Sequence, residues 1–111
     1  MDESARLASQ LVEFTDRHGR KFWLSPKGLH HIGHDNEIKD PLLFVQQALQ
    51  QTVAIVESNS KPGTWLYYAP MRNGLYYTAV ASTQDQRIKT AYVSSRIKKG
   101  EIRWQSSRLE I

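Results

Sequence analysis

The side chains best suited to acid–base chemistry in this 111-residue chain are His30, His31 and His34, which lie within five positions. Imidazole titrates near neutral pH, so a histidine can both take and give a proton. On a helix His30 and His34 lie one turn apart, and His31 and His34 are also neighbours.

Two helical histidines at this spacing can also bind zinc. The glutamate of a zincin motif is missing here, the chain has no cysteine, and the sequence suggests no third ligand. We therefore expect no metal and no other cofactor, and acid–base work for the histidines. Surface histidines without a role are the remaining alternative.

A pair of hydroxyl groups, on Thr90 and Tyr92, occurs in the second half of the chain. The surrounding run 87–93 has the β-branched and aromatic content of a strand. Alternation along a strand predicts that Thr90, Tyr92 and Ile88 share one face, while Ala91 and Val93 point the other way. We expect the histidines and this hydroxyl pair to meet at one site.

The composition indicates one globular domain. An apolar content of 40% with 10% aromatics is typical of a chain with a single modest core. We expect residues 1–10 to be a flexible lead-in and residues 11–111 to form the domain. The acidic start 1–4 and the lack of a long apolar run predict no signal peptide and no membrane partner, hence a soluble, cytoplasmic protein.

Positive charge is concentrated in the second half of the chain. Residues 1–60 hold six Lys/Arg and eight Asp/Glu, whereas residues 61–111 hold nine and three. Such a basic half is typical of a protein that binds a polyanion such as nucleic acid, although a solvated surface gives the same pattern. The candidates for phosphate contact are Arg72, next to an expected turn, and the group Arg96, Lys98 and Lys99.

Local signals predict a hairpin and two helices ahead of a sheet. Segments 11–14 and 21–24 flank an Asp-to-Gly turn, with His18 exposed at its tip. Ser25-Pro26 and Asp40-Pro41 each combine a capping side chain with a proline suited to the first helical position. The first helix should be short, from Lys27 to about Asn36, because it contains two glycines. The apolar face expected for the second helix is Leu42, Phe44, Val45, Ala48 and Leu49.

After the second helix the apolar period changes to that of strands. Segments 53–57, 64–71, 75–81 and 87–93 are joined by short connections, which predicts an antiparallel meander. Segment 101–104, after Gly100, should add an edge strand. The expected fold class is α+β: an N-terminal hairpin and two helices packed on a curved antiparallel sheet of about four strands.

Two tyrosine doublets, 67–68 and 76–77, fall on strands joined by Asn73-Gly74, the strongest turn signal in the chain. A two-residue loop there predicts that Tyr68 lies opposite Ala79 and that Tyr77 lies opposite Pro70. Most of these rings should pack in the core or across strands, while one or two could stack on RNA bases, with Tyr68 as a candidate.

In order and spacing, these motifs resemble the phage-associated nuclease domains of the barnase–EndoU–colicin–RelE superfamily. The matching segments cover about residues 11–104. The first matching segments are Leu24-Ser25-Pro26, which enters a helix containing His31-Ile32, and His34-Asp35-Asn36-Glu37, in which a histidine precedes an acidic stretch. An apolar helix and strands follow, including the segment 88–92. The last matching segment is 98–104, which combines basic residues, a glycine and a tryptophan.

The resemblance implies a toxin-like or phage-derived endoribonuclease in which the ribose 2′-hydroxyl attacks the adjacent phosphate without a metal. It implies His31 and His34 as acid and base, with His30 as a substitute because the spacing leaves open which of His30 and His31 is equivalent. Thr90 and Tyr92 would contact the scissile phosphate, and Arg72 or Lys89 would supply charge.

The expected partners are an RNA substrate and an antitoxin or immunity protein. The alternative hypothesis is a catalytically inactive RNA-binding or protein-interaction domain on the same fold.

Overall fold

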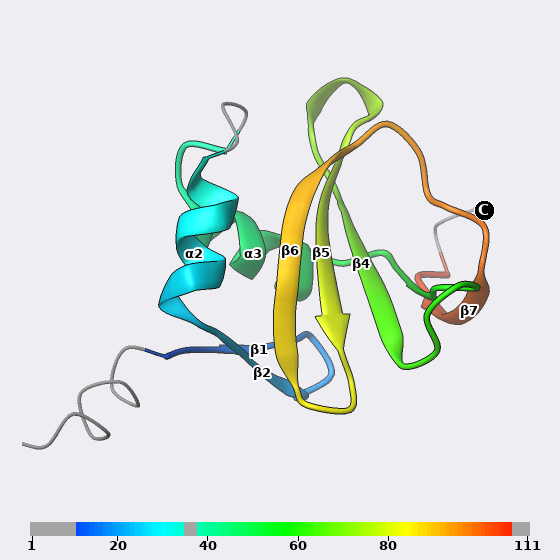
Figure 1. The fold of residues 1–111 in the computed structure, drawn as a ribbon. Helices are drawn as coiled ribbons and strands as arrows, with labels where there is room; N and C mark the ends of the chain where they lie inside the picture. Colours follow the sequence, from blue (N-terminus) through cyan, green and yellow to red (C-terminus); the bar gives the residue numbers. More distant parts are fainter. Residues whose placement is uncertain (1–10, 35–37, 108–111) are drawn as a thin grey trace, which may run out of the picture.

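The protein is an α+β domain in the computed structural model, which describes residues 11–34 and 38–107 (Figure 1). The elements are β1 (Val12–Thr15), β2 (Lys21–Leu24), α2 (Pro26–Gly33), α3 (Pro41–Gln50), β3 (Ala54–Glu57), β4 (Thr64–Pro70), a 3-10 turn η1 (Arg72–Gly74), β5 (Tyr76–Ser82), β6 (Arg87–Ser94) and β7 (Glu101–Gln105). The lead-in expected at 1–10 and the stretch 35–37 lie outside the described residues. Neither α2 nor α3 has the length and hydropathy of a helix that crosses a membrane.

Both helices begin where the sequence predicts. The Ser25 side chain accepts a hydrogen bond from the backbone N–H of Gly28 at 3.0 Å, and Pro26 occupies the first turn of α2. Asp40 accepts from the N–H of Leu43 at 3.1 Å, and Pro41 opens α3. Each cap satisfies a backbone donor that has no partner inside the helix, which stabilises a helix by about 1 kcal/mol.

The apolar face of α3 differs from the prediction at one position. Phe44, Val45, Ala48 and Leu49 are buried, but Leu42 is exposed. Leu42 and its neighbour Leu43 lie in the exposed first turn of α3, so helical periodicity alone misassigned Leu42.

The sheet has seven strands, in the order β1-β2-β6-β5-β4-β3-β7, rather than about four. Two pairings between segments far apart in the sequence add the further strands. The β1–β2 hairpin joins the meander through a parallel bridge between Trp23 and Arg87, so the sheet is mixed rather than purely antiparallel. At the other end β7 pairs with β3 as the expected edge strand.

The helices cover one face of this sheet. Figure 1 shows α3 behind β4, β5 and β6, with α2 beside β6. The main core lies under them and includes Ile32, Val45, Leu49, Tyr67 and Ala79. The opposite face carries a smaller apolar cluster of Val56, Leu66 and Tyr68, against which Tyr76, Val80 and Ile97 pack. We call this second surface the open face.

A β-bulge corrects the predicted face of Ile88. Val80 pairs with Thr90 but Ala81 pairs with Ile88, so Lys89 is the extra residue on β6. Because a bulge breaks the two-residue alternation, Ile88 packs into the main core with Ala91 and does not share a face with Thr90.

The turn between β4 and β5 corrects the predicted tyrosine register. Asn73 and Gly74 both have positive φ, as the sequence indicates, but the loop contains three residues because Met71 pairs with Leu75. The extra residue shifts the register by one. Tyr68 therefore lies opposite Thr78, and Tyr77 lies opposite Ala69.

A buried carboxylate holds the β1–β2 hairpin against the sheet. Asp16 is 2% exposed, and its oxygens accept hydrogen bonds from the backbone N–H groups of His18 and Arg20, from the Arg20 guanidinium, and from the Tyr67 hydroxyl at 2.6 Å. Burial alone would raise the pKa of Asp16, but these four donors outweigh it, so the pKa lies below its ordinary value.

The hairpin tip also contacts the far end of the sheet. The Arg17 guanidinium donates to the carbonyl of Thr52 and lies 4.7 Å from the centre of the Trp104 ring. His18, exposed as predicted, contacts the edge of the same ring. The sheet is therefore curled until its first hairpin meets β7, and this fixes the direction in which β2 leads into α2.

Candidate functional site

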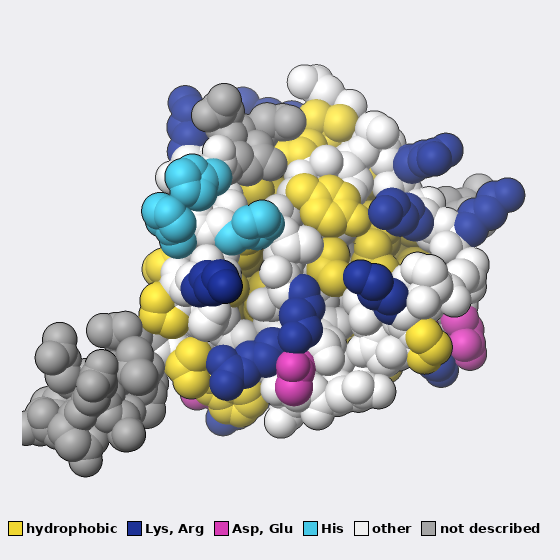
Figure 2. Space-filling model, in the orientation of Figure 1, with side chains coloured by type: hydrophobic (Ala, Val, Ile, Leu, Met, Phe, Trp, Pro, Cys, Tyr) yellow, Lys and Arg dark blue, Asp and Glu magenta, His cyan; other side chains and the backbone are white. Residues whose placement is uncertain are grey.

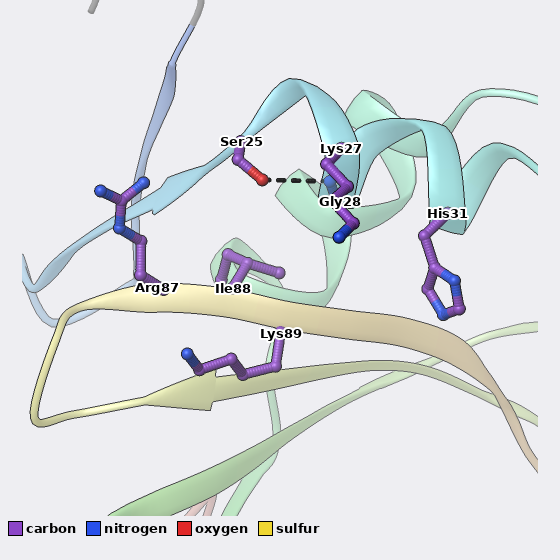
Figure 3. A pocket seen from close by; sticks show the side chains of 7 residues that line it. All are labelled: Ser25, Lys27, Gly28, His31, Arg87, Ile88 and Lys89. Carbon is purple, nitrogen blue, oxygen red and sulfur yellow. Dashed lines mark hydrogen bonds between the residues drawn. The ribbon is translucent and has the colours of Figure 1, made fainter.

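An open groove of about 650 Å³ lies between the first turns of α2 and the start of β6. It brings together one imidazole and three cationic side chains from two elements that are far apart in sequence (Figure 3). Its lining is Ser25, Lys27, Gly28, His31, Arg87, Ile88 and Lys89.

The helix supplies Lys27 and His31 to the groove because they lie one turn apart on the same side of α2. Ile32, the next residue, is 1% exposed and anchors the helix to the core. Figure 3 shows the His31 ring extending from α2 toward β6. The imidazole is itself exposed and therefore accessible to a ligand in the groove.

Gly28 lets the start of α2 lie close to β2. A Cβ atom at this position would lie 2.8 Å from Leu24 Cδ1 and 3.3 Å from the Ser25 hydroxyl oxygen. A larger side chain would push the helix outward or displace the capping serine. The width of the groove at this end is thus fixed by the packing of a glycine.

The positive charge of the groove is partly neutralised at one position. Lys89 Nζ lies 2.8 Å from a carboxylate oxygen of Asp85. The hydrogen bond from Lys89 lowers the pKa of Asp85, so the carboxylate is ionised at neutral pH. Lys27 and Arg87 have no ion-pair partner within 11–34 and 38–107.

His30 and His34 are not part of the groove lining and contact each other. Their Nε2 atoms are 2.9 Å apart, and both side chains are exposed. Of the three sequence candidates, only His31 lines the groove.

Thr90 and Tyr92 lie on the open face, where they pair with Val80 and Thr78. Neither lines the groove of His31. Figure 2 nevertheless shows the histidine patch of α2 and the side chains of the open face on the same side of the molecule, because α2 stands beside β6. The contact between His31 and the hydroxyl pair remains a prediction.

A second basic surface adjoins Tyr92. The loop after β6 forms a shallow cavity lined by Arg96, Ile97, Lys98 and Lys99. Lys98 Nζ lies 5.9 Å from the centre of the Tyr92 ring, and the backbone N–H of Lys98 donates to the Tyr68 hydroxyl. Lysine and arginine side chains extend over this face in Figure 2.

Two further sequence candidates lie apart from the groove lining. Tyr68 is fully buried, and burial raises the pKa of its hydroxyl. Its ring has no exposed surface on which a base could stack, so we leave Tyr68 out of the proposed site. Arg72 is exposed in the turn η1, at the end of the β4–β5 hairpin.

Sequence reasoning missed Ser25, Lys27 and Arg87 as groove residues. A signal for Lys27 was present, because it precedes His31 by four positions on a helix. Arg87 carried no comparable signal, since its place beside α2 depends on the non-local bridge to Trp23.

Within the described ranges, no three His, Asp or Glu side chains converge as metal ligands. The groove lining contains no carboxylate, and its chemistry is that of an anion site with one imidazole. Fold and groove together define a small α+β protein with a basic, histidine-containing surface groove. No protein-family model, curated protein sequence or solved structure matches the chain.

Proposed function

We propose that the protein is an endoribonuclease that cleaves RNA at the groove of His31 by attack of the ribose 2′-hydroxyl on the adjacent phosphate. The observation that carries the proposal is that an exposed imidazole and three cationic side chains, Lys27, Arg87 and Lys89, line one groove. Cations close to a phosphate stabilise the charge that builds on its oxygens in the transition state.

In the proposed reaction His31 takes the proton of the 2′-hydroxyl as the general base. The 2′-oxygen forms a bond to phosphorus, the bond from phosphorus to the 5′-oxygen breaks, and the leaving oxygen receives a proton. We propose an ammonium group of the groove as the donor of that proton, and we favour Lys27 because Lys89 is engaged with Asp85. The products are a 2′,3′-cyclic phosphate and a free 5′-hydroxyl.

Thr90 and Tyr92 are proposed to contact the RNA backbone on the open face as it leaves the groove. The loop 96–99 would bind the following phosphates, since it carries three cationic side chains and adjoins Tyr92 through Lys98. A ribonuclease of this kind is toxic to the cell that makes it, and we therefore retain a toxin-like or phage-derived protein with an antitoxin or immunity partner as part of the proposal.

The test is cleavage of total RNA and of a fluorescent RNA oligonucleotide by the purified protein, with and without EDTA. We expect His31→Ala to slow cleavage by about 10²–10⁴-fold, the usual contribution of a general acid or base. His18→Ala is the matched control, because His18 is also exposed but lies at the hairpin tip. Induced expression of the parent and of His18→Ala should slow cell growth, and expression of His31→Ala should slow it less. His34→Ala and Tyr92→Phe are compared in the same growth assay.

Intact RNA under all conditions would overturn the nuclease proposal, and equal cleavage by the parent and His31→Ala would overturn the assignment of His31. Cleavage that EDTA abolishes would require a metal-dependent mechanism instead.

One observation favours a second candidate, an RNA-binding domain without activity. His31 is the one histidine of the groove lining, so a histidine pair for acid–base catalysis is incomplete there. On this alternative, RNA binds without being cut. Each groove cation replaced by alanine should then reduce the salt dependence of binding to single-stranded RNA by about 0.7 in the log–log slope.

A further inference from the structure

The outer side of α2 carries a histidine pair that the groove does not use. His30 and His34 are separated by one helical turn, and their Nε2 atoms lie 2.9 Å apart with the rings almost perpendicular, at 79°. Both side chains are exposed; His30 lies in the last turn of α2, and His34 is the C-cap residue directly after that helix. The pair is therefore held together by the helix itself and not by a ligand or a second element.

We propose that His30 and His34 form a surface site for a divalent first-row transition-metal ion, and for Cu²⁺ most tightly. In the structure the two Nε2 atoms are close enough to share a proton, one ring donating and the other accepting. A metal ion can replace that bridging proton once the donor ring carries its proton on Nδ1. Both rings then bind the ion through Nε2, and neutral imidazole is a preferred ligand for copper, nickel and zinc.

The separation of the two nitrogens selects among these ions. With metal–nitrogen bonds of about 2.0–2.1 Å, nitrogens 2.9 Å apart subtend an angle of about 90° at the metal. This is the angle between neighbouring ligands in tetragonal or octahedral coordination, which Cu²⁺ and Ni²⁺ adopt. A tetrahedral Zn²⁺ ion would need the nitrogens about 3.3 Å apart, so the two side chains have to rotate slightly apart before they bind zinc.

We propose that water fills the remaining coordination positions. Within the described residues no third His, Asp or Glu side chain joins the pair. A site with two protein ligands and open positions binds reversibly, and it lies outside the groove lined by His31. The ion would thus be a ligand of the outer side of α2 and not a participant in the proposed cleavage.

The experiment is a titration of the full chain with CuCl₂, NiCl₂ and ZnCl₂ in a non-chelating buffer, followed by calorimetry and, for copper, by electron paramagnetic resonance. We expect one Cu²⁺ per chain with the signature of two nitrogen ligands, and weaker binding of Ni²⁺ and Zn²⁺. His30→Ala and His34→Ala should each weaken Cu²⁺ binding by on the order of 100-fold, because the second ligand of a linked pair binds at high effective concentration. His18→Ala should bind as the parent does.

Circular dichroism establishes that each variant is folded, and His30→Gln and His34→Gln replace any alanine variant that is not. Cu²⁺ binding that survives in the variant lacking both histidines, or a resonance spectrum with fewer than two nitrogen ligands, would overturn the proposal. Because no RNA enters these measurements, the outcome is separate from the success or failure of the nuclease assignment.

Discussion

The buried contact between Asp16 and Tyr67 should be one of the largest single contributions to stability in this protein. The Asp16 side chain is fully inaccessible to solvent, and the Tyr67 hydroxyl donates to it at 2.6 Å. Tyr67→Phe removes only this donor and leaves three others on the carboxylate. A hydrogen bond to a charged group contributes about 1.5–3 kcal/mol, so we expect the free energy of unfolding to fall by about 2 kcal/mol.

Asp16→Asn should lower the free energy of unfolding more than Tyr67→Phe does. The amide has one acceptor oxygen, whereas the carboxylate has two. In one orientation of the amide its NH₂ group faces the donors of Tyr67 and Arg20, and in the other it faces the two backbone N–H groups. Leaving buried donors without an acceptor costs about 1–3 kcal/mol for each group, so we expect a loss of about 3 kcal/mol or more.

The assay is equilibrium unfolding in urea, followed by tryptophan fluorescence, for the parent, the two single variants and the double variant. If the two side chains stabilise the fold through each other, the double variant loses less than the sum of the single losses, by about 1.5–3 kcal/mol. Losses that add within about 0.5 kcal/mol would refute the reasoning. A small loss for Asp16→Asn alone would refute the claim that the carboxylate is needed.

The same contact predicts how stability depends on pH. The folded pKa of Asp16 lies below its ordinary value of 3.8, so its contribution is complete above that pH and is lost as the pH falls through the folded pKa. Burial, together with the bond to Asp16, raises the pKa of Tyr67 above its ordinary value of 10.0. Stability should therefore also decrease above pH 10, where the unfolded chain releases the tyrosine proton first, and Tyr67→Phe should remove that part of the loss.

Three further variants test the packing before β7, the cap of α2 and the charge balance of the groove. Gly100→Ala should destabilise the fold by about 1–3 kcal/mol in urea, because its Cβ would clash with the Glu57 carbonyl oxygen; Gly33→Ala is the control, because the nearest atom there is 3.8 Å away. Ser25→Ala should lower stability by about 1 kcal/mol through loss of the α2 cap, and an unchanged unfolding midpoint would contradict that role. Asp85→Ala removes the partner of Lys89 and should strengthen binding of a single-stranded RNA oligonucleotide in fluorescence anisotropy, more at low salt than at high salt; weaker binding would show that Lys89 needs its partner for orientation.

The elements that local chemistry specifies are predictable from the sequence. Ser25-Pro26 and Asp40-Pro41 begin helices because a cap and a proline act within four residues. Asn73-Gly74 marks a turn because both residues tolerate positive φ. The loop length at that turn is set by the pairing of Met71 with Leu75, which local preference does not determine, and one added residue moved every tyrosine to a new partner.

The candidate functional site likewise has features that local chemistry specifies and features that long-range packing specifies. The histidines and Lys89 are recognisable as candidates from their chemistry, and the distinction among His30, His31 and His34 depends on which side of α2 faces β6. That is decided by the burial of Ile32 and by the bulge at Lys89, both of which require the sheet to exist. The role of Arg87 depends on a single parallel bridge between strands separated by two helices and three strands of chain.

The curl of the sheet links the stability of the protein to its proposed chemistry. Asp16 fixes the hairpin tip on Tyr67, and Arg17 fixes it near Trp104. The hairpin in turn carries β2, whose last residue, Leu24, packs under Gly28 at the start of α2. Any loosening of the hairpin therefore moves Lys27 and His31 relative to the cations of β6 before it unfolds the domain. A variant with a weakened Asp16 contact should therefore lose RNA cleavage at urea concentrations where tryptophan fluorescence still reports a folded chain. Side chains of a surface patch that acted independently of the fold would keep their activity under those conditions.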